Sequence, residues 1–301
     1  MNKLNVLSLL LVCLLPGLAC RSSKPPPPTP QASGIAARLT SQAETQSTQQ
    51  NWPAAATEWK KAADQFGLLN DLPRQAIALH NQGQAEQEQS HLEAALRLFE
   101  IAAALNQKTG QTSEWWRNQI ALLQVEAGLS NRAPALERRF QELAPKARDL
   151  HDPSIHGLFQ NELGLSNIAK KQWAEAEASF LAAEKAFAES KNATGTAAAQ
   201  GNRALLAEAT HKFATAESLW RSSLSQFEKL AQPTGIARSL AGIGRSLLGQ
   251  QKNLAEAEDL LRRAAENFRL LKLDAERKKA LEAISLVPRR EGRNKQSANP
   301  R

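Results

Sequence analysis

Tyrosine is absent from the 301-residue chain, and the β-branched residues typical of strands are few. Ala, Leu, Glu, Gln, Lys and Arg dominate instead, and these residues favour helix over strand. The sequence therefore predicts an all-α protein. A chain of this length is long enough for one large core or for a long array of small units.

A basic surplus is also missing from the body of the chain, although the formal net charge is +8. Residues 35–287 carry 30 basic and 29 acidic side chains. A nucleic-acid-binding domain would carry its basic surplus on the folded body, so we expect no nucleic-acid partner. The excess positive charge lies at the two ends of the chain, which contain one acidic residue, Glu291. The basic residues there are Lys3, Arg21, Lys24, Arg289, Arg290, Arg293, Lys295 and Arg301.

Catalytic and metal-binding motifs are lacking too. No G-x-S-x-G, H-E-x-x-H, Gly-rich phosphate loop or paired-cysteine motif occurs. His151 and His156 flank Asp152, but the turn contains proline and no further ligand is near in sequence. We therefore expect no metal, no cofactor, no small-molecule substrate and no enzyme activity.

The amino terminus has the pattern of a secretory signal. A positive start precedes an apolar stretch over residues 4–15, which is too short to span a bilayer comfortably. The ending Gly17-Leu18-Ala19-Cys20 resembles a bacterial lipobox. This resemblance implies that residues 1–19 are a lipoprotein signal peptide and that Cys20 is lipidated, by diacylglycerol and an amide-linked chain such as palmitate. An ordinary signal peptide with a chance cysteine is the alternative.

The cysteine count favours lipidation. Cys13 lies in the removed segment, so Cys20 would be the only mature cysteine and could form no internal disulfide. Arg21 follows it, where an Asp commonly signals inner-membrane retention in lipoproteins of diderm bacteria. The resemblance thus implies a lipid anchor in the outer membrane, with the protein facing the periplasm of the cell envelope.

Two segments carry no apolar period. Residues 20–34 hold five prolines and are expected to form an extended linker, a semi-rigid spacer between membrane and domain. A Pro-rich recognition motif is the alternative. The tail over residues 288–301 is basic and polar and is expected to be disordered. It is either a solvated end or a contact for acidic lipid or polysaccharide.

A helical pattern recurs along residues 35–287. Each copy has a small residue with large apolar residues three before and four after it, which places all of them on one helical face. The markers, at intervals of 40 or 41 residues, are Ala55, Ala95, Leu136, Ala176, Ala216 and Ala257. The residues four later are Trp59, Phe99, Phe140, Phe180, Trp220 and Leu261.

Each copy also has a preceding helix with a small residue, such as Gly83, Gly164 or Gly244, that would let the paired helices cross closely. Helix breakers separate the copies, so the predicted unit is helix, turn, longer helix, turn. The third unit is degenerate, since Ala133 and Leu136 exchange the usual sizes. A final helix over residues 273–286 would cap the array with its polar face.

This unit resembles the tetratricopeptide repeat. The matching residues of the fourth unit are Gly164, Trp173, Ala176, Phe180 and Ala183. Because the usual repeat has about 34 residues, the chain is similar to the subclass with longer repeats of about 40. The resemblance covers roughly residues 38–272 and implies a right-handed α-solenoid of about six units. A HEAT-type array is the alternative on period alone.

In that architecture the first helix of each unit lines a concave groove that binds an extended peptide or helix. Amides there could bond a peptide backbone, and Arg could bind a carboxylate. The register predicts as partner-binding residues His80, Gln84, Asn118, Asn161, Asn202, Arg238 and Arg245. For each, an ordinary solvent-facing position is the alternative.

Trp115 and Trp116 are neighbours, and side chains of neighbours on a helix point about 100° apart. One of them is expected to be an exposed anchor for a partner, unless both are buried between units. The sequence thus favours a lipid-anchored envelope adaptor that binds a protein or peptide. Two alternatives remain: a helical scaffold of an envelope enzyme or its regulator, and a structural spacer or self-associating protein.

Overall fold

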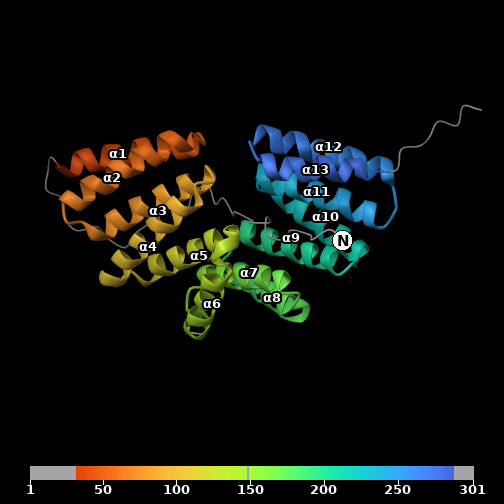
Figure 1. Ribbon diagram of the computed structural model, residues 1–301, viewed down its shortest axis with the longest axis horizontal. Coiled ribbons are helices and arrows are strands. Elements are labelled where there is room, and N and C mark those ends of the chain that lie inside the picture. The colour runs from red at the N-terminus through yellow and green to blue at the C-terminus, as the bar shows by residue number, and fades with distance from the viewer. Residues whose placement is uncertain (1–31, 148, 288–301) are drawn as a thin grey trace, which may run out of the picture.

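The computed structural model describes residues 32–147 and 149–287, and within them every regular element is a helix (Figure 1). The predicted signal peptide, Cys20 and the basic tail lie outside the described residues. The helices are α1 (Ala32–Thr48), α2 (Trp52–Leu68), α3 (Leu72–Glu88), α4 (Leu92–Lys108), α5 (Thr112–Gly128), η2 (Ser130–Arg132), α6 (Ala133–Ala147), α7 (Pro153–Ala169), α8 (Trp173–Glu189), α9 (Ala193–Ala209), α10 (Phe213–Lys229), α11 (Pro233–Gly249), α12 (Leu254–Leu270) and α13 (Asp274–Ser285).

The predicted periodicity is confirmed by the first residues of the helices. Helices α2, α4, α6, α8, α10 and α12 each begin at the residue three before the repeat marker. The chain therefore folds as six helix pairs, α1–α2 to α11–α12, followed by α13. Two details differ from the prediction. The second helix of a pair is not longer, since α7 and α8 both have 17 residues, and α1 begins at Ala32, inside the predicted linker.

The small and large residues of the pattern form the contacts between paired helices. Ala176 and Phe180 of α8 are both 0% exposed. Gly164 of α7 faces Phe180 so closely that an added Cβ would lie 2.4 Å from its Cε1. Gly83 faces Phe99 in the same way, at 2.8 Å. The glycines thus allow the close crossing that the sequence predicted, because no Cβ separates the helix backbone from the aromatic ring.

One turn geometry recurs between the helices. The residue two before the next helix has a positive φ, as in Asn70 (51°), Lys191 (55°) and Ala231 (49°). The residue after it is the N-cap of the next helix, and in two cases its side chain accepts a backbone hydrogen bond: Asp71 from Arg74 and Asn192 from Gly195. Repeating this turn between most successive helices keeps the pairs in register.

The third pair departs from this regularity. Leu129 is extended, the short helix η2 replaces the usual turn, and α6 has only 15 residues. Ala133 is exposed and Leu136 is half-buried, because the exchange of sizes puts a methyl group where the other pairs have a large side chain. Helix α6 accordingly packs less extensively on its neighbours than other outer helices, and it projects from the array in Figure 1.

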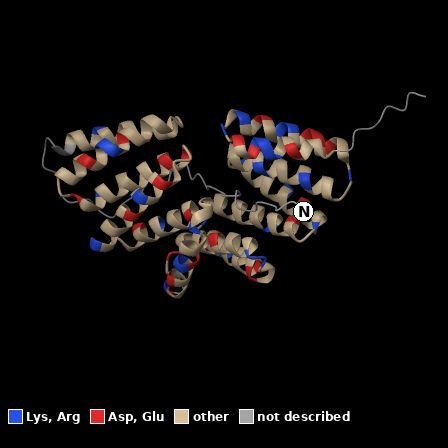
Figure 2. Ribbon diagram, in the orientation of Figure 1, with Lys and Arg blue, Asp and Glu red and all other residues tan. Residues whose placement is uncertain are grey.

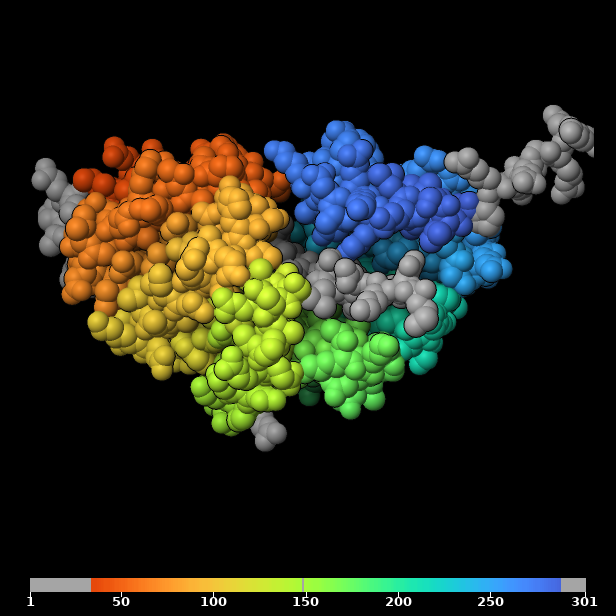
Figure 3. Space-filling model, in the orientation of Figure 1, coloured from red at the N-terminus to blue at the C-terminus, as the bar shows by residue number. Residues whose placement is uncertain are grey.

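The helices form two layers. The odd-numbered helices from α3 to α11 contact one another in sequence, and no pair of even-numbered helices in the described chain packs as extensively. We therefore call the odd-numbered helices inner and the even-numbered helices outer. Helices α1–α4 and α10–α13 form two flanks that α5–α9 join below in the view of Figures 1 and 3.

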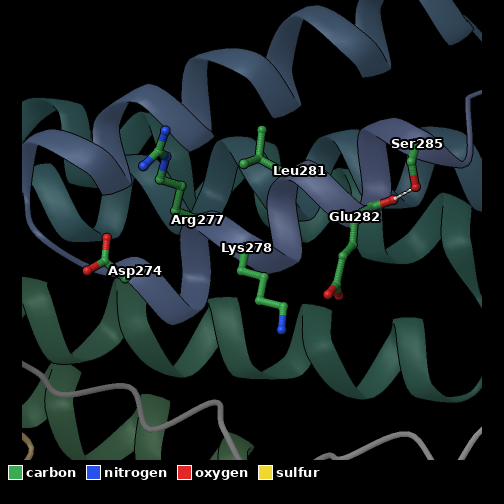
Figure 4. Close-up of a pocket in the computed structure, with 6 residues that line it drawn as sticks. All are labelled: Asp274, Arg277, Lys278, Leu281, Glu282 and Ser285. Atoms are coloured by element: carbon green, nitrogen blue, oxygen red, sulfur yellow. Dashed lines mark hydrogen bonds between the residues drawn. The ribbon is translucent and has the colours of Figure 1, made fainter.

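Helix α13 ends the array. Its free side carries Asp274, Arg277, Lys278 and Glu282 around the exposed Leu281 (Figure 4). This charged surface agrees with the predicted polar face of a terminal helix. None of the described helices is both long enough and apolar enough to span a bilayer.

Candidate binding site on the inner helices

One side of each inner helix faces away from the outer layer. Arg203, the eleventh residue of α9, forms ion pairs with Glu177 and Glu184 of α8, so this position faces the outer helices. A residue two positions later points about 160° away. The thirteenth residue of each inner helix, and the sixth on the same side, therefore form what we call the inner face.

The inner face is apolar in the middle and polar toward both ends. Its central residues are Leu158 and Leu165 of α7, which are half-buried, and Leu205 of α9, which is 8% exposed. The polar residues on the N-terminal side are Gln84, Arg117 and Gln124, beside the apolar Ile77, and those on the C-terminal side are Arg238, Arg245 and Lys279. An apolar strip between polar groups is the usual lining of a peptide-binding surface.

A side-chain bond crosses every interface between successive inner helices from α3 to α13. The five bonds are His80–Asn118 (2.9 Å), Gln124–Glu162 (3.0 Å), Asn161–Asn202 (2.7 Å), Arg245–Glu208 (2.9 Å) and Arg238–Glu276 (3.2 Å). Six of the nine residues predicted to bind a partner belong to this series. The structure therefore gives them contacts within the array that the sequence analysis did not foresee.

The amide and imidazole members of the series are buried. Asn202 is 0% exposed, Asn161 2%, Asn118 1% and His80 8%. Burial lowers the pKa of His80, although its hydrogen bond to Asn118 acts in the opposite direction. A neutral imidazole beside the neutral amide of Asn118 fits this environment, because burial disfavours the charged form.

Three charged members, Arg238, Arg245 and Glu276, lie on α11 and α13, where the two flanks approach each other. Burial raises the pKa of Glu88, in the last turn of α3, to about 7, while the charge of Arg238 lowers it and that of Glu276 raises it. Burial lowers the pKa of Lys279; the charge of Glu276 acts against this shift, and the charges of Arg245 and Arg238 add to it. Because these side chains shift one another's pKa values, α3, α11 and α13 share one charged region.

Gln84, Trp115 and Trp116, the other predicted residues, have different environments. Gln84 is exposed on the inner face. Trp116 is 4% exposed and packs edge-to-face on Phe159, with ring centroids 5.9 Å apart. Trp115 is half-buried, and the ammonium nitrogen of Lys146 lies 5.2 Å from its ring centroid. Trp115 is thus the more accessible of the pair.

Sequence reasoning missed four members of these bonds, namely Gln124, Glu162, Glu208 and Glu276. A signal for them exists in the spacing. The two residues of each of the five bonds are separated by 37 to 41 positions, which is about one repeat. A search for polar residues one repeat apart would have paired them.

Outside the inner face, the described charged residues and possible metal ligands do not indicate a second site. Basic and acidic residues are interspersed through all parts of the array (Figure 2). In residues 32–147 and 149–287, no group of three or more His, Cys, Asp and Glu is arranged to hold a metal ion. Asp152 caps α7 by accepting from the backbone of Ser154 and Ile155, and His156 contacts Gln160.

The fold is similar to that of solved helical-repeat proteins. A Rap protein, crystallised in complex with Competence and Sporulation Factor, aligns over 84% of this chain and 74% of its own, with a TM-score of 0.62 and 14% identity. The TPR2AB domain of yeast Sti1 and BtubC from P. vanneervenii align less closely, with TM-scores of 0.37 and 0.36 and 13% identity. The alignment with the Sti1 domain spans 85% of this chain and 99% of that domain, and the alignment with BtubC spans 91% of this chain and 96% of BtubC.

No protein-family model and no curated protein matches the chain by sequence. The array is therefore defined by its architecture: it is an all-α, tetratricopeptide-like solenoid of six helix pairs with a terminal helix. At 14% identity, the similarity to the Rap protein is one of fold.

Proposed function

We propose that the chain is a binding scaffold whose inner face holds an extended segment of a protein or peptide. The observation that carries the proposal is the half-buried strip of Leu158 and Leu165 between polar inner-face residues of neighbouring repeats. A strip of this kind contacts apolar side chains, while the flanking amides and cations bond the backbone and polar groups of the same segment. The Rap protein, which has a similar fold, was crystallised with a bound partner, Competence and Sporulation Factor, and this supports the proposal.

Photo-crosslinking tests this proposal. A benzoylphenylalanine replaces Gln84, which is exposed on the inner face, and in the control it replaces Arg97, which is exposed on outer helix α4. Each protein is exposed to an envelope extract and irradiated. We expect protein or peptide adducts from position 84 and none of the same mass from position 97. Equal crosslinking at both positions would overturn the proposal.

We further propose that the scaffold is attached to the bacterial envelope through a lipid on Cys20, facing the periplasm and most consistent with the outer membrane. The lipobox-like ending and the following Arg21 support this, and two or more acyl chains provide stable anchoring. Labelling with a palmitate analogue should mark the wild-type protein in the membrane fraction. The Cys20→Ser variant should be unlabelled and soluble; a labelled variant would contradict lipidation at this residue.

A further inference from the structure

The acidic residues on the inner helices differ in their partners. Glu208 pairs with Arg245, Glu276 with Arg238, and Glu126 with Arg139. Glu162 of α7 is only 5% exposed, yet among the described residues it forms no ion pair. Its bonded neighbours are amides: Gln124 donates from Nε2 over 3.0 Å, and Asn161 is adjacent in the chain.

Glu162 lies on the side of α7 that faces away from outer helix α8. Gly164, two residues later, is in contact with Phe180 of α8, and two residues correspond to a rotation of about 200°. Leu158 and Leu165, four residues before and three after, share the face of Glu162. Both are half-buried residues of the inner face. The carboxyl group is thus placed beside the apolar strip.

The electrostatics of this position are those of an incomplete site. Burial raises the pKa of Glu162 to about 7, and the hydrogen bonds from Gln124 and Asn161 offset only part of that effect. The same polar cluster contains one unsatisfied acceptor. Asn202 donates from Nδ2 to Asn161 and is 0% exposed, and no described residue donates to its Oδ1. Buried acceptors without donors are uncommon in folded proteins.

We propose that Glu162 recognises a cationic side chain, Lys or Arg, of the segment that binds the inner face. An ammonium or guanidinium group supplies several donors and a full charge, and an ion pair in this enclosed position is stronger than the neutral bond from Gln124 that it would displace. The aliphatic stem of Lys or Arg would lie against Leu158 and Leu165, as such stems do on apolar surfaces.

This inference rests on the proposed function, and its test separates the two. A displayed library of random dodecapeptides is selected against the full chain purified in detergent. The same selection is made with Glu162→Gln, which keeps size and hydrogen bonding, and with the control Glu189→Gln, an exposed residue on outer helix α8. A wild-type helical circular dichroism spectrum and a cooperative melting transition establish that each variant is folded.

We expect the wild type and the Glu189→Gln control to select peptides with Lys or Arg at one fixed position. The Glu162→Gln variant should select peptides without that preference. By calorimetry, replacing the peptide's cation with norleucine should weaken binding to the wild type about tenfold and binding to Glu162→Gln less than twofold.

Two results would overturn the inference in different ways. Peptides selected without a basic position, or a norleucine effect that is equal in wild type and Glu162→Gln, would refute cation recognition while leaving peptide binding in place. Failure of the folded wild-type protein to select any peptide would refute the proposed function and this inference with it.

Discussion

Asn202 donates from Nδ2 to Asn161 Oδ1 over 2.7 Å, and the two side chains are almost fully enclosed between α7 and α9. The two residues are 41 positions apart. They therefore lie about one repeat apart, on the inner helices of neighbouring repeats. A pair of buried amides in this location holds two repeats in a fixed relative position, since sliding one helix along the other would leave both amides without partners.

Replacing Asn202 with Ala should therefore destabilise the array by about 1–3 kcal/mol, because Asn161 is left buried without its donor. The double variant with Asn161→Ala should cost less than the sum of the single changes. Urea unfolding followed by circular dichroism measures all three. Gln84→Ala, on the exposed part of the inner face, is the control and should change stability by less than about 0.5 kcal/mol. Strict additivity of the two Asn changes would show that they do not interact.

Much of the fold is predictable from the sequence because the repeat determines it. The intervals of 40 and 41 residues between Ala55, Ala95 and their counterparts predicted the number and positions of the helix pairs. The small residues predicted where the paired helices cross closely. The candidate site was harder. Whether an inner-helix Asn faces solvent or a neighbouring Asn depends on the rotation between repeats, which is set by tertiary packing. A single residue such as Asn161 carries no sign of that rotation.

The glycine contacts predict a second effect on stability. In Gly164→Ala, the new Cβ would lie 2.4 Å from Phe180 Cε1, so α7 or the ring must move, at a cost of roughly 1–3 kcal/mol. Gly34→Ala in α1 is the control, since nothing lies within 4 Å of the added atom. The control should be neutral or stabilising, because Ala favours helix over Gly. Thermal melting of both variants measures the difference, and equal melting temperatures would contradict the packing described.

The recurrent turns predict a stabilising change. Ala231 has φ of 49°, a left-handed conformation that costs an L-residue roughly 1–2 kcal/mol and costs Gly little. Ala231→Gly should therefore stabilise the protein by up to about 1 kcal/mol, once the greater freedom of Gly in the unfolded chain is subtracted. The same substitution at Ala178, exposed within helix α8, should destabilise by about 1 kcal/mol. Urea midpoints that move in the same direction for both would contradict this.

A buried ion pair joins helix α6 to α5. Arg139 donates from Nε and Nη2 to the carboxylate of Glu126 over 2.8 and 2.7 Å, and from Nη1 to Gln119 over 3.0 Å. Arg139→Met should leave Glu126, which is 2% exposed, as an uncompensated buried charge, with a local cost of about 3–5 kcal/mol. We expect faster amide hydrogen exchange in α6 while α2 and α12 keep wild-type rates. Arg138→Met, exposed one residue earlier, is the control. Unchanged exchange in α6 would show that the pair does not attach it.

Glu162 predicts a dependence of stability on pH. Burial raises its pKa from 4.5 to about 7. Below pH 4.5 the group is protonated in both the folded and the unfolded chain. Between pH 4.5 and 7 the unfolded chain releases the proton while the folded chain keeps it, so the free energy of unfolding falls as pH rises. Above pH 7 both are ionised and the loss is complete, on the order of 3 kcal/mol.

Glu162→Gln removes this contribution, so the variant should gain stability relative to the wild type as pH rises from 4.5 to 7 and keep the gain above it. Taking the difference between two proteins cancels Glu88, whose pKa is also raised to about 7, and His80, whose pKa is lowered by burial. Urea unfolding at half-unit pH steps measures the difference, with Glu189→Gln as the exposed control. A difference that stays constant across the range would mean that the carboxyl group is not desolvated, and the cation site proposed for it would lose its electrostatic basis.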